Sequence, residues 1–400
     1  MTVSAALERQ PDAAGPLQGI RILDLSSVIM GPFATQTLGD MGAEIITVET
    51  VEGGGNRNMG AGPHDEFSGI ALNLLRNKRS ICLDMKHPKG REAVLRIAAS
   101  CDALVTNLRP KPLKRLGLTY DDVVKVRPDI VYCQAQGFRS DTDRADDPAY
   151  DDIIQAESGI ADATRRTGRD PMLAPTIMAD KICGLTIVNA VTAALLYRAR
   201  TGRGQRIEVP MADVMTSFML VEHGAGAISV PPSGEVGWGR ALSPERGPQR
   251  TLDGWINILP YSLEAYEALF TAGNRRDLIR PERTKKDLAR EATYLYQELK
   301  TIVATRTTQY WLDFCNAHSI PVGKIGDLDE LVEALPVAQH PATGPYHVIP
   351  PPIWFTATPA QVRQPAPRLG ADGHAILKDA SYRDAEIADL IAVGVMRPPT

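Results

Sequence analysis

The chain has 400 residues, of which 44% are hydrophobic and 23% are charged, and its formal net charge is −4. A single hydrophobic core usually stops growing at about 250–300 residues, so this length predicts two domains or one composite domain. The composition excludes collagen-like, low-complexity and extensively disordered classes. The slightly acidic charge balance gives no electrostatic reason to expect a nucleic-acid or anionic-membrane partner.

The five cysteines are scattered and include no C-x-x-C pair; they are Cys82, Cys101, Cys133, Cys183 and Cys315. This pattern predicts neither a disulfide framework nor a zinc site and is typical of a reducing compartment. Residues 1–15 lack the apolar core of a signal peptide and are expected to form a flexible leader. No stretch is expected to reach the length of a membrane span. We therefore expect a cytoplasmic protein without a membrane partner.

The first part of the chain alternates short apolar runs with helical segments. A strand is expected at 20–25, followed by a small-residue turn, a helix at 31–41 and a strand at 44–49, which is the order of a βαβ unit. Further strands are expected at 80–84, 103–107 and 130–136, with a helix at 88–99. Repeated β-then-α segments predict an α/β fold with an open, mainly parallel, Rossmann-like sheet that carries helices on both faces.

The chain then changes character twice. Residues 182–200 are apolar, rich in Ala and Leu and end in basic residues before Gly202, which predicts a long buried helix; a strand is expected at 205–209. Residues 224–250 contain many dispersed glycines and prolines, which indicates a mobile connection and a domain boundary. Helices are expected again within 262–318 and near 384–393.

The turn from Ser26 to Pro32, after the first expected strand, opens a helix. Its free N–H groups could hold a phosphate or a thioester oxygen, although a tight structural turn is an alternative interpretation. Neither the G-x-G-x-x-G pattern of dinucleotide-binding folds nor a Walker G-x-x-x-x-G-K-[ST] pattern is present. Basic residues cluster in two places near expected strand ends: Lys78, Arg79, Lys86 and Lys89 around the third strand, and Arg109, Lys111, Lys114 and Arg115 after the strand that ends at Asn107. They suit either a polyphosphate or a solvated helix face.

Asp180 stands directly before the long apolar helix. An aspartate at this position is typical of a helix N-cap. It is also a candidate nucleophile, because the positive end of a helix favours an ionised carboxylate. The seven histidines form no H-E-x-x-H or similar pattern, so no metal site is expected. The residues alone leave both roles of Asp180 open.

An ordered set of short segments runs over most of the chain: 19–25 (GIRILDL), 31–32 (GP), 42–46 (GAEII), 77–81 (NKRSI), 83–86 (LDMK), 201–205 (TGRGQ) and 365–370 (PAPRLG). Each segment is a weak signal by itself. Together they resemble the class III CoA-transferases, the CaiB/BaiF family that includes formyl-CoA transferase and the carnitine-pathway CoA-transferase. The resemblance implies an enzyme that moves CoA from an acyl-CoA donor to a carboxylic acid acceptor.

The resemblance also implies functional residues. Asp180 falls on the nucleophilic aspartate of the family, which forms mixed-anhydride and aspartyl-CoA thioester intermediates. The residues implied to contact coenzyme A are Val28, Ile29, Met30, Leu83, Asp84, Met85, Lys86, Asn107, Leu108, Arg115, Gln136, Gly137, Phe138 and Arg139. Coenzyme A and acyl-CoA are substrates here, so no cofactor is implied.

The family architecture predicts an interlocked homodimer whose large domain contains both chain ends. On that basis residues 16–223 and 331–400 are expected to form the large CoA-binding domain. Residues 224–330 are expected to form a linker or flap and a smaller α+β domain. The glycines of this segment are dispersed, whereas formyl-CoA transferase has a run of consecutive glycines in its active-site flap.

Two alternative functions share parts of this pattern. A 2-methylacyl-CoA racemase or epimerase has the same fold and moves an α-proton with a histidine and an aspartate. Tyr150 stands at the position of that histidine, and a phenol is a poor base at neutral pH, which disfavours racemisation. The other alternative is a CoA-binding protein without catalysis, which Asp180 disfavours only weakly.

Overall fold

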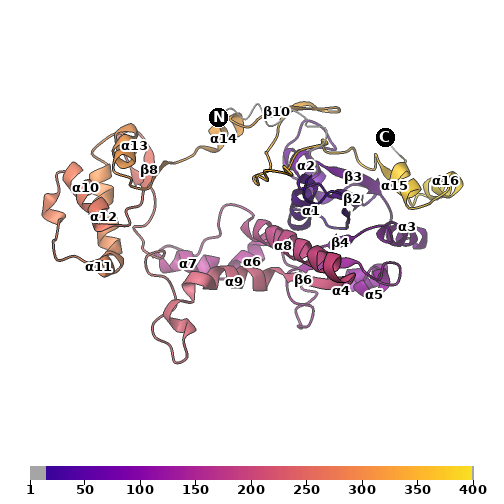
Figure 1. Cartoon of the computed structure of the whole chain (residues 1–400), viewed down its shortest axis with the longest axis horizontal. Helices are drawn as coiled ribbons and strands as arrows, with labels where there is room; N and C mark the ends of the chain where they lie inside the picture. The colour runs from indigo at the N-terminus through magenta and orange to yellow at the C-terminus, as the bar shows by residue number, and fades with distance from the viewer. Residues whose placement is uncertain (1–14, 399–400) are drawn as a thin grey trace. The chain divides into compact units, whose positions relative to one another are not determined.

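The computed structural model describes residues 15–398 and divides into two compact units (Figure 1). Unit 1 contains the chain up to Ser158, Ala174–Phe218 and the chain from Leu335 onwards, and unit 2 contains Gly159–Leu173 and Met219–Ala334. Compared with the predicted small domain of 224–330, unit 2 also contains residues 159–173, 219–223 and 331–334. Within it, Arg166 donates a hydrogen bond to the carbonyl oxygen of Val236 at 3.3 Å. The predicted leader lies, except for residue 15, outside the described residues.

Unit 1 is built on a six-stranded parallel sheet with the strand order β3-β2-β1-β4-β5-β6. Its strands are β1 (Arg21–Asp24), β2 (Glu44–Glu49), β3 (Lys78–Cys82), β4 (Ala103–Thr106), β5 (Val131–Gln136) and β6 (Gln205–Pro210). The predicted parallel sheet is confirmed. The third strand begins two residues earlier than expected, at Lys78, whose side chain is fully buried beneath the helix that follows β1.

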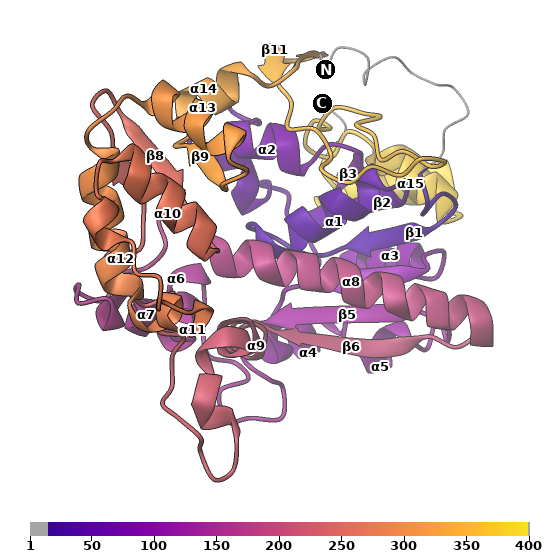
Figure 2. The same ribbon diagram turned by 60° about the vertical axis from the view of Figure 1, so that its left-hand side comes forward.

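Helices cover both faces of this sheet, as predicted (Figure 2). One face carries α1 (Met30–Asp40) and α8 (Met178–Thr201). The other carries α3 (Pro88–Ala98), α4 (Pro110–Leu116), α5 (Tyr120–Val123), α15 (Gly373–Asp379) and α16 (Asp384–Ala392). Strand side chains alternate between these faces. Leu23, Ile46 and Ile81 therefore share one apolar core with α3, α15 and α16.

Helix α8 corrects an expectation about membranes. By length and composition it could cross a membrane, although no stretch was expected to reach that length. In unit 1 it packs instead on α1, β5 and β6 and buries Cys183, Ile187 and Val191. Its outer face keeps Leu185, Leu196 and Tyr197 exposed.

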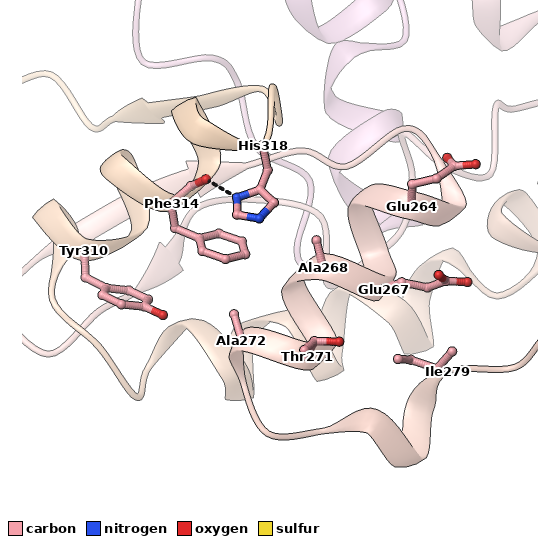
Figure 3. Close-up of a pocket in the computed structure, with 9 residues that line it drawn as sticks. All are labelled: Glu264, Glu267, Ala268, Thr271, Ala272, Ile279, Tyr310, Phe314 and His318. Carbon is pink, nitrogen blue, oxygen red and sulfur yellow. Dashed lines mark hydrogen bonds between the residues drawn. The ribbon is translucent and has the colours of Figure 1, made fainter.

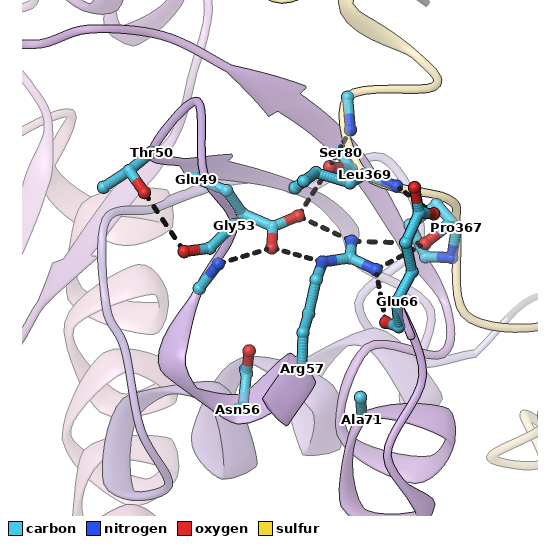
Figure 4. Close-up of polar contacts among 12 residues, drawn as sticks. Glu49, Thr50, Gly53, Asn56, Arg57, Glu66, Ala71, Ser80, Pro367 and Leu369 are labelled. Atoms are coloured by element: carbon cyan, nitrogen blue, oxygen red, sulfur yellow. Dashed lines mark hydrogen bonds and ion pairs between the residues drawn. The ribbon is translucent and has the colours of Figure 1, made fainter. Parts of the chain in front are cut away.

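The C-terminal segment of unit 1 returns to the β3 edge of the sheet. Ser80 donates its N–H to Asp372 at 2.9 Å, and Leu83 forms an antiparallel bridge with Met396. A buried ion pair fastens the same segment to β2: Arg57 binds both carboxylate oxygens of Glu49, at 2.6 and 2.7 Å, and donates to the carbonyl oxygen of Pro367 (Figure 4). The remaining elements of unit 1 are η2 (Gly55–Asn58), α2 (Gly69–Leu74), α6 (Asp151–Glu157), β10 (Val337–His340) and β11 (Gly344–His347).

Unit 2 is a smaller α+β unit, as predicted. Its antiparallel sheet contains β7 (Gln249–Arg250), β8 (Trp255–Ile258) and β9 (Val322–Lys324). Its helices are α7 (Ile160–Arg166), η3 (Ala225–Ile228), α10 (Leu263–Ala272), η4 (Arg276–Leu278), α11 (Lys285–Arg290), α12 (Ala292–Val303), α13 (Thr308–Ala317) and α14 (Leu328–Glu333), while α9 (Met211–His223) crosses from unit 1. Arg240, in the glycine-rich connection, donates to the Tyr296 hydroxyl at 2.7 Å, so this segment is tied to the core of unit 2.

Candidate active site

Most of the predicted CoA-binding residues lie at one edge of the unit 1 sheet. The strands are parallel, so their carboxyl ends meet at the same edge, which is where open α/β sheets bind ligands. The residues implied to bind CoA follow β1, β3, β4 and β5 directly, and Arg115 lies on α4, the helix after β4. The sheet therefore brings four separate stretches of the chain to one edge.

The turn from Ser26 to Met30, between β1 and α1, has a strained and closely held backbone. Val28 has a positive φ of 67°, a conformation that a β-branched residue rarely adopts. Asn107 clamps the turn, since its side chain accepts from the N–H of Ser27 at 3.0 Å and donates to the carbonyl oxygen of Ser27 at 2.8 Å. Within residues 15–398, the N–H groups of Val28 and Ile29 have no hydrogen-bond acceptor. They are free to bind a ligand oxygen.

Asp180 is not the N-cap of the long helix. Helix α8 begins at Met178, two residues before Asp180, and Ile177 is its N-cap. Asp180 therefore lies in the first turn, where it is 9% exposed. Its own N–H donates to Oδ1 of Asp151 at 3.0 Å. A carboxylate from another helix thus accepts this N–H group, and within residues 15–398 no group donates a hydrogen bond to the Asp180 carboxyl group.

Asp151 is held in turn by Gln155, one turn further along α6. Nε2 of Gln155 donates to Oδ2 of Asp151 at 2.5 Å and to the carbonyl oxygen of Thr176 at 3.0 Å. Oε1 of Gln155 accepts from the N–H of Ala174 at 2.8 Å. Gln155 is fully buried, and its bonds to Ala174 and Thr176 connect α6 with the segment that leads into α8. The sequence reasoning missed both Asp151 and Gln155, since nothing in their spacing connects them with Asp180.

Two close approaches bring Asp180 near the predicted CoA-binding segments. A Cβ atom at Gly184, one turn after Asp180 on the same face of α8, would lie 2.9 Å from the carbonyl oxygen of Met30. A Cβ atom at Gly137 would lie 2.4 Å from that of Ala149, two residues before Asp151. Helix α8, which carries Asp180, therefore packs against the start of α1, and the segment after β5 packs against the residues before α6.

Burial raises the pKa of Asp180 to about 6, and the negative charge of Asp151 adds to the effect. The sequence predicted instead that the helix end keeps this carboxylate ionised. Desolvation raises the pKa more than the helix dipole lowers it, because removing a carboxylate from water costs more free energy than its interaction with the dipole provides. Asp180 therefore titrates close to neutrality.

This pKa predicts a pH dependence for any reaction in which Asp180 acts as a nucleophile. Only the ionised carboxylate attacks, so kcat/KM should rise through pH 6 and level off above it. Asp151→Asn keeps an acceptor for the Asp180 N–H but removes the neighbouring charge, so the inflection should move to lower pH. Asp152→Asn, which changes an exposed residue on the same helix, is the control and should leave the profile unchanged. An inflection that stays in place in Asp151→Asn would assign the rise to another group.

The predicted CoA-binding residues differ in what they can offer a ligand. The Leu83 side chain is only 1% exposed and belongs to the core, so a contact with Leu83 would have to use its backbone. Gln136 donates to the carbonyl oxygen of Phe138 and to Glu208, and Arg139 is paired with Asp141.

Two basic side chains are better placed to bind an anion. Lys86 and Arg115 are exposed, and within residues 15–398 neither has a hydrogen-bond or ion-pair partner for its side chain. Of the remaining predicted positions, Asp84 accepts from the N–H of Lys86, Met85 and Leu108 pack on the core, and Arg144 stacks on Phe138.

A shallow depression in unit 2 contains none of these residues (Figure 3). Helix α13 and its C-cap residue His318 contribute three rings, Tyr310, Phe314 and His318, whose neighbours stack at 6.2 and 4.1 Å, and α10 contributes Glu264 and Glu267. His318 and Glu264 are exposed. The depression holds no buried nucleophile, so we place the candidate active site in unit 1.

Comparison with known proteins decides the family. The model of CoA-transferase family III matches residues 17–373. The chain belongs to this family. Succinyl-CoA:glutarate CoA-transferase of Mus musculus is 31% identical over 96% of this chain and 91% of its own, and succinate–glutarate CoA-transferase of Agrobacterium fabrum is 30% identical over 90% and 94%. Formyl-CoA:oxalate CoA-transferase of Rhodopseudomonas palustris is 26% identical over 96% and 98%.

Solved structures agree with the family III assignment. The crystal structure of a CAIB/BAIF family protein from Brucella suis matches with a TM-score of 0.77 and 27% identity, over 92% of this chain and all of that one. The resemblance drawn from the short sequence segments is therefore confirmed. The protein is a class III CoA-transferase.

Proposed function

We propose that this family III CoA-transferase moves CoA from an acyl-CoA donor to a carboxylic acid acceptor through covalent intermediates on Asp180. The observation that carries this proposal is the buried Asp180 carboxyl group. It lies in the first turn of α8, which packs against a turn with free backbone N–H groups at the ligand-binding edge of the sheet.

The proposed reaction conserves a thioester at each exchange. Asp180 attacks the acyl-CoA carbonyl carbon, the C–S bond breaks and CoA thiolate leaves a mixed anhydride. The thiolate attacks the aspartyl carbonyl, which releases the donor acid and gives an aspartyl-CoA thioester. The acceptor carboxylate then attacks this thioester and expels the thiolate, and the thiolate attacks the new acyl group to release acyl-CoA and the Asp180 carboxylate. One thioester replaces another, so we propose no cofactor, metal or ATP.

Free backbone N–H groups support this sequence of steps. Each attack places a negative charge on a carbonyl oxygen, and fixed donors lower the energy of such an oxyanion. Val28 and Ile29 provide two N–H groups without an acceptor in the described part of the chain. We propose that these two groups stabilise the tetrahedral intermediates.

A 2-methylacyl-CoA racemase remains the alternative within this fold. That reaction needs a base next to the aspartate. Tyr150 is the N-cap residue of α6 and its side chain is 69% exposed, in contrast to the buried Asp180. An exposed phenol is poorly suited to remove an α-proton, so the site favours CoA transfer.

We propose a dicarboxylate as the acceptor, because the relatives with 29–31% identity include succinyl-CoA:glutarate CoA-transferases. Purified protein should be screened with succinyl-CoA against glutarate, other diacids of three to six carbons, and matched monocarboxylic acids. Formyl-CoA with oxalate and a 2-methylacyl-CoA are the comparison substrates. Turnover with diacids only is the expected result. Preferred turnover of monocarboxylic acids would contradict the acceptor class, and epimerisation without transfer would contradict the reaction.

The exposed Arg115 is proposed to bind the nucleotide half of CoA. A charge-assisted contact with a phosphate contributes about 1–3 kcal/mol, so Arg115→Ala should raise the Kd for CoA by roughly 5- to 100-fold while kcat changes little. Lys114→Ala removes the same charge from the neighbouring exposed position of α4 and is the control. Calorimetric titration at two salt concentrations checks the prediction. Equal affinities for the Arg115→Ala protein and wild type at both salts would show that this arginine is merely solvated.

A homodimer is also proposed, with the two chains interlocked. Three large apolar side chains, Leu185, Leu196 and Tyr197, are exposed on α8, and an interface would cover them. An interlocked dimer cannot separate without unfolding, so it should persist on dilution to about nanomolar concentration whatever the area of its contacts. Mass photometry measures this directly. A monomer under native conditions would contradict the architecture.

We propose a cytoplasmic location, because all five cysteines are buried and unpaired.

A further inference from the structure

A buried ion pair that the transfer mechanism does not use lies beneath the β1–α1 turn. Lys78 opens β3 and Asp24 ends β1, and both side chains are completely buried. Ile22, Ile45 and Lys78 are in register across β1, β2 and β3, so Lys78 points to the same face as Asp24, two residues further along β1. The lysine therefore reaches across β2, under α1.

The Lys78 ammonium group uses all three of its hydrogens on this side of the sheet. It donates to Oδ2 of Asp24 at 3.1 Å, to the carbonyl oxygen of Pro32 at 3.0 Å and to Oγ1 of Thr35 at 2.7 Å. Pro32 and Thr35 belong to the first turns of α1, whereas Asp24 belongs to β1. One ammonium group thus joins the element before the turn to the element after it.

Asp24 extends the same network into the turn itself. Its Oδ1 accepts from the N–H of Ser26 at 2.9 Å and from the Ser26 hydroxyl, and its Oδ2 accepts from Thr35 at 2.5 Å. Gly31 packs closely against Ser26, because a Cβ atom at Gly31 would lie 2.2 Å from that of Ser26. Asp24 and Lys78 therefore bond to residues before and after the strained peptide, while Asn107 bonds to Ser27 within the turn.

This arrangement accounts for the strain at Val28. A β-branched residue at positive φ costs on the order of 1–3 kcal/mol and persists only where the surroundings hold it. The strained peptide lies between two fixed points. Its N–H and that of Ile29 have no acceptor within residues 15–398, and the carbonyl group of the next residue, Met30, lies against α8. A turn with one anchor less could relax φ at Val28 and turn these donors away.

We propose that Lys78 and Asp24 are a positioning pair for CoA transfer: they hold the Ser26–Met30 turn so that its free N–H groups face the carbonyl that Asp180 attacks. This inference rests on the proposed function. A misplacement of about 1 Å at a reacting centre can reduce a rate 100-fold. Loss of the pair should therefore act on kcat, in addition to any loss of stability.

The chain offers a matched control pair at the other end of α1. Arg76 and Asp40 are each 3% exposed and pair at 2.6 Å, and Asp40 ends α1, at the opposite end from the turn. The double variants Asp24→Asn/Lys78→Met and Asp40→Asn/Arg76→Met each remove a buried charge pair without leaving an unpaired charge. Thr35→Val is a milder third variant, which removes one anchor and keeps both charges.

The expected result separates positioning from folding. Both double variants should have a similarly lowered Tm. Only Asp24→Asn/Lys78→Met should also lower kcat by about 10- to 100-fold at a temperature where it is folded, with a smaller loss in Thr35→Val. Hydrogen exchange followed by mass spectrometry should show faster exchange in a peptide spanning residues 26–30 for that variant and not for the control.

Several outcomes would overturn the proposal. A kcat within twofold of wild type for folded Asp24→Asn/Lys78→Met would make the pair purely structural, as would equal kcat losses in both double variants. If that variant does not fold, an unchanged kcat in Thr35→Val has the same meaning. Exchange of the turn needs no substrate, so unaltered exchange overturns the positioning even if the proposed reaction fails. Absence of transfer in wild type would instead contradict the proposed function alone.

Discussion

Replacing Asp180 by alanine or asparagine is expected to abolish CoA transfer while leaving the protein folded. The reaction needs a carboxylate that attacks a thioester, and neither substitute forms the anhydride. Removing a nucleophile typically costs three to six orders of magnitude in kcat, and we expect a loss of about 10³-fold or more. Coupled assays of acyl-CoA formation with wild type and both variants measure it. Turnover within tenfold of wild type in either variant would refute the role of Asp180.

The covalent intermediate offers an independent test of the same residue. Wild-type protein incubated with acyl-CoA and hydroxylamine should carry a hydroxamate on the peptide that contains Asp180, because hydroxylamine captures an activated aspartyl carbonyl. Asp151→Asn should still form this adduct at a pH well above 6, since Asp151 bonds to the Asp180 N–H and not to its carboxyl group. A hydroxamate on any other carboxylate would move the nucleophile elsewhere.

The unfolding stability of the Asp180 variants shows whether they are folded when transfer is lost. The pKa of Asp180 is raised from 3.8 to about 6, so the folded state holds the proton over a pH range in which the unfolded state has lost it. The raised pKa therefore lowers the free energy of unfolding. This loss is absent below about pH 4, grows between pH 4 and 6 and is fully present above pH 6. Asp180→Asn removes a buried charge worth about 1–3 kcal/mol of destabilisation. It should therefore unfold at an equal or higher urea concentration at pH 7.5, with no gain near pH 4.

Removing Arg57 is expected to destabilise unit 1 more than any other single change considered. Arg57→Met leaves the Glu49 carboxylate buried without its cation and frees the carbonyl oxygen of Pro367, and breaking such a pair costs about 3–5 kcal/mol. The double variant Glu49→Gln/Arg57→Met should recover part of this loss, because it leaves no unpaired charge. Urea unfolding at a fixed protein concentration measures both.

A surface pair that fastens the same C-terminal segment is the matched control. Lys89 on α3 contacts Asp389 on α16 at 2.5 Å, but both side chains are about half exposed. Lys89→Ala should change the free energy of unfolding by about 1 kcal/mol or less, because solvent screens an exposed pair. Equal losses in Arg57→Met and Lys89→Ala would show that burial does not govern the contribution of Arg57.

The parallel sheet was predictable because its signal is local. Strands such as Glu44–Glu49 and Val131–Gln136 are apolar runs with helical segments between them, and the βαβ order predicts that their carboxyl ends share an edge. Gln136 and Asn107 could be placed at that edge for the same reason. Whether their side chains are available to bind a ligand could not be predicted. In the structure the Asn107 side chain is hydrogen-bonded to Ser27, and the Gln136 side chain is hydrogen-bonded to Phe138 and Glu208.

The sequence by itself determined the fold class, the family and the position of the candidate nucleophile, because periodicity, turn residues and short ordered segments depend on neighbours in the chain. Only the tertiary structure decided the state of that nucleophile. The neighbours of Asp180 come from 29 residues away, at Asp151, and those of Asp24 from 54 residues away, at Lys78. Burial and charge act through space. Both raise the pKa of Asp180. Lys78, which the sequence shows only as part of a basic cluster, lies beneath the β1–α1 turn because the register of β1, β2 and β3 places it there.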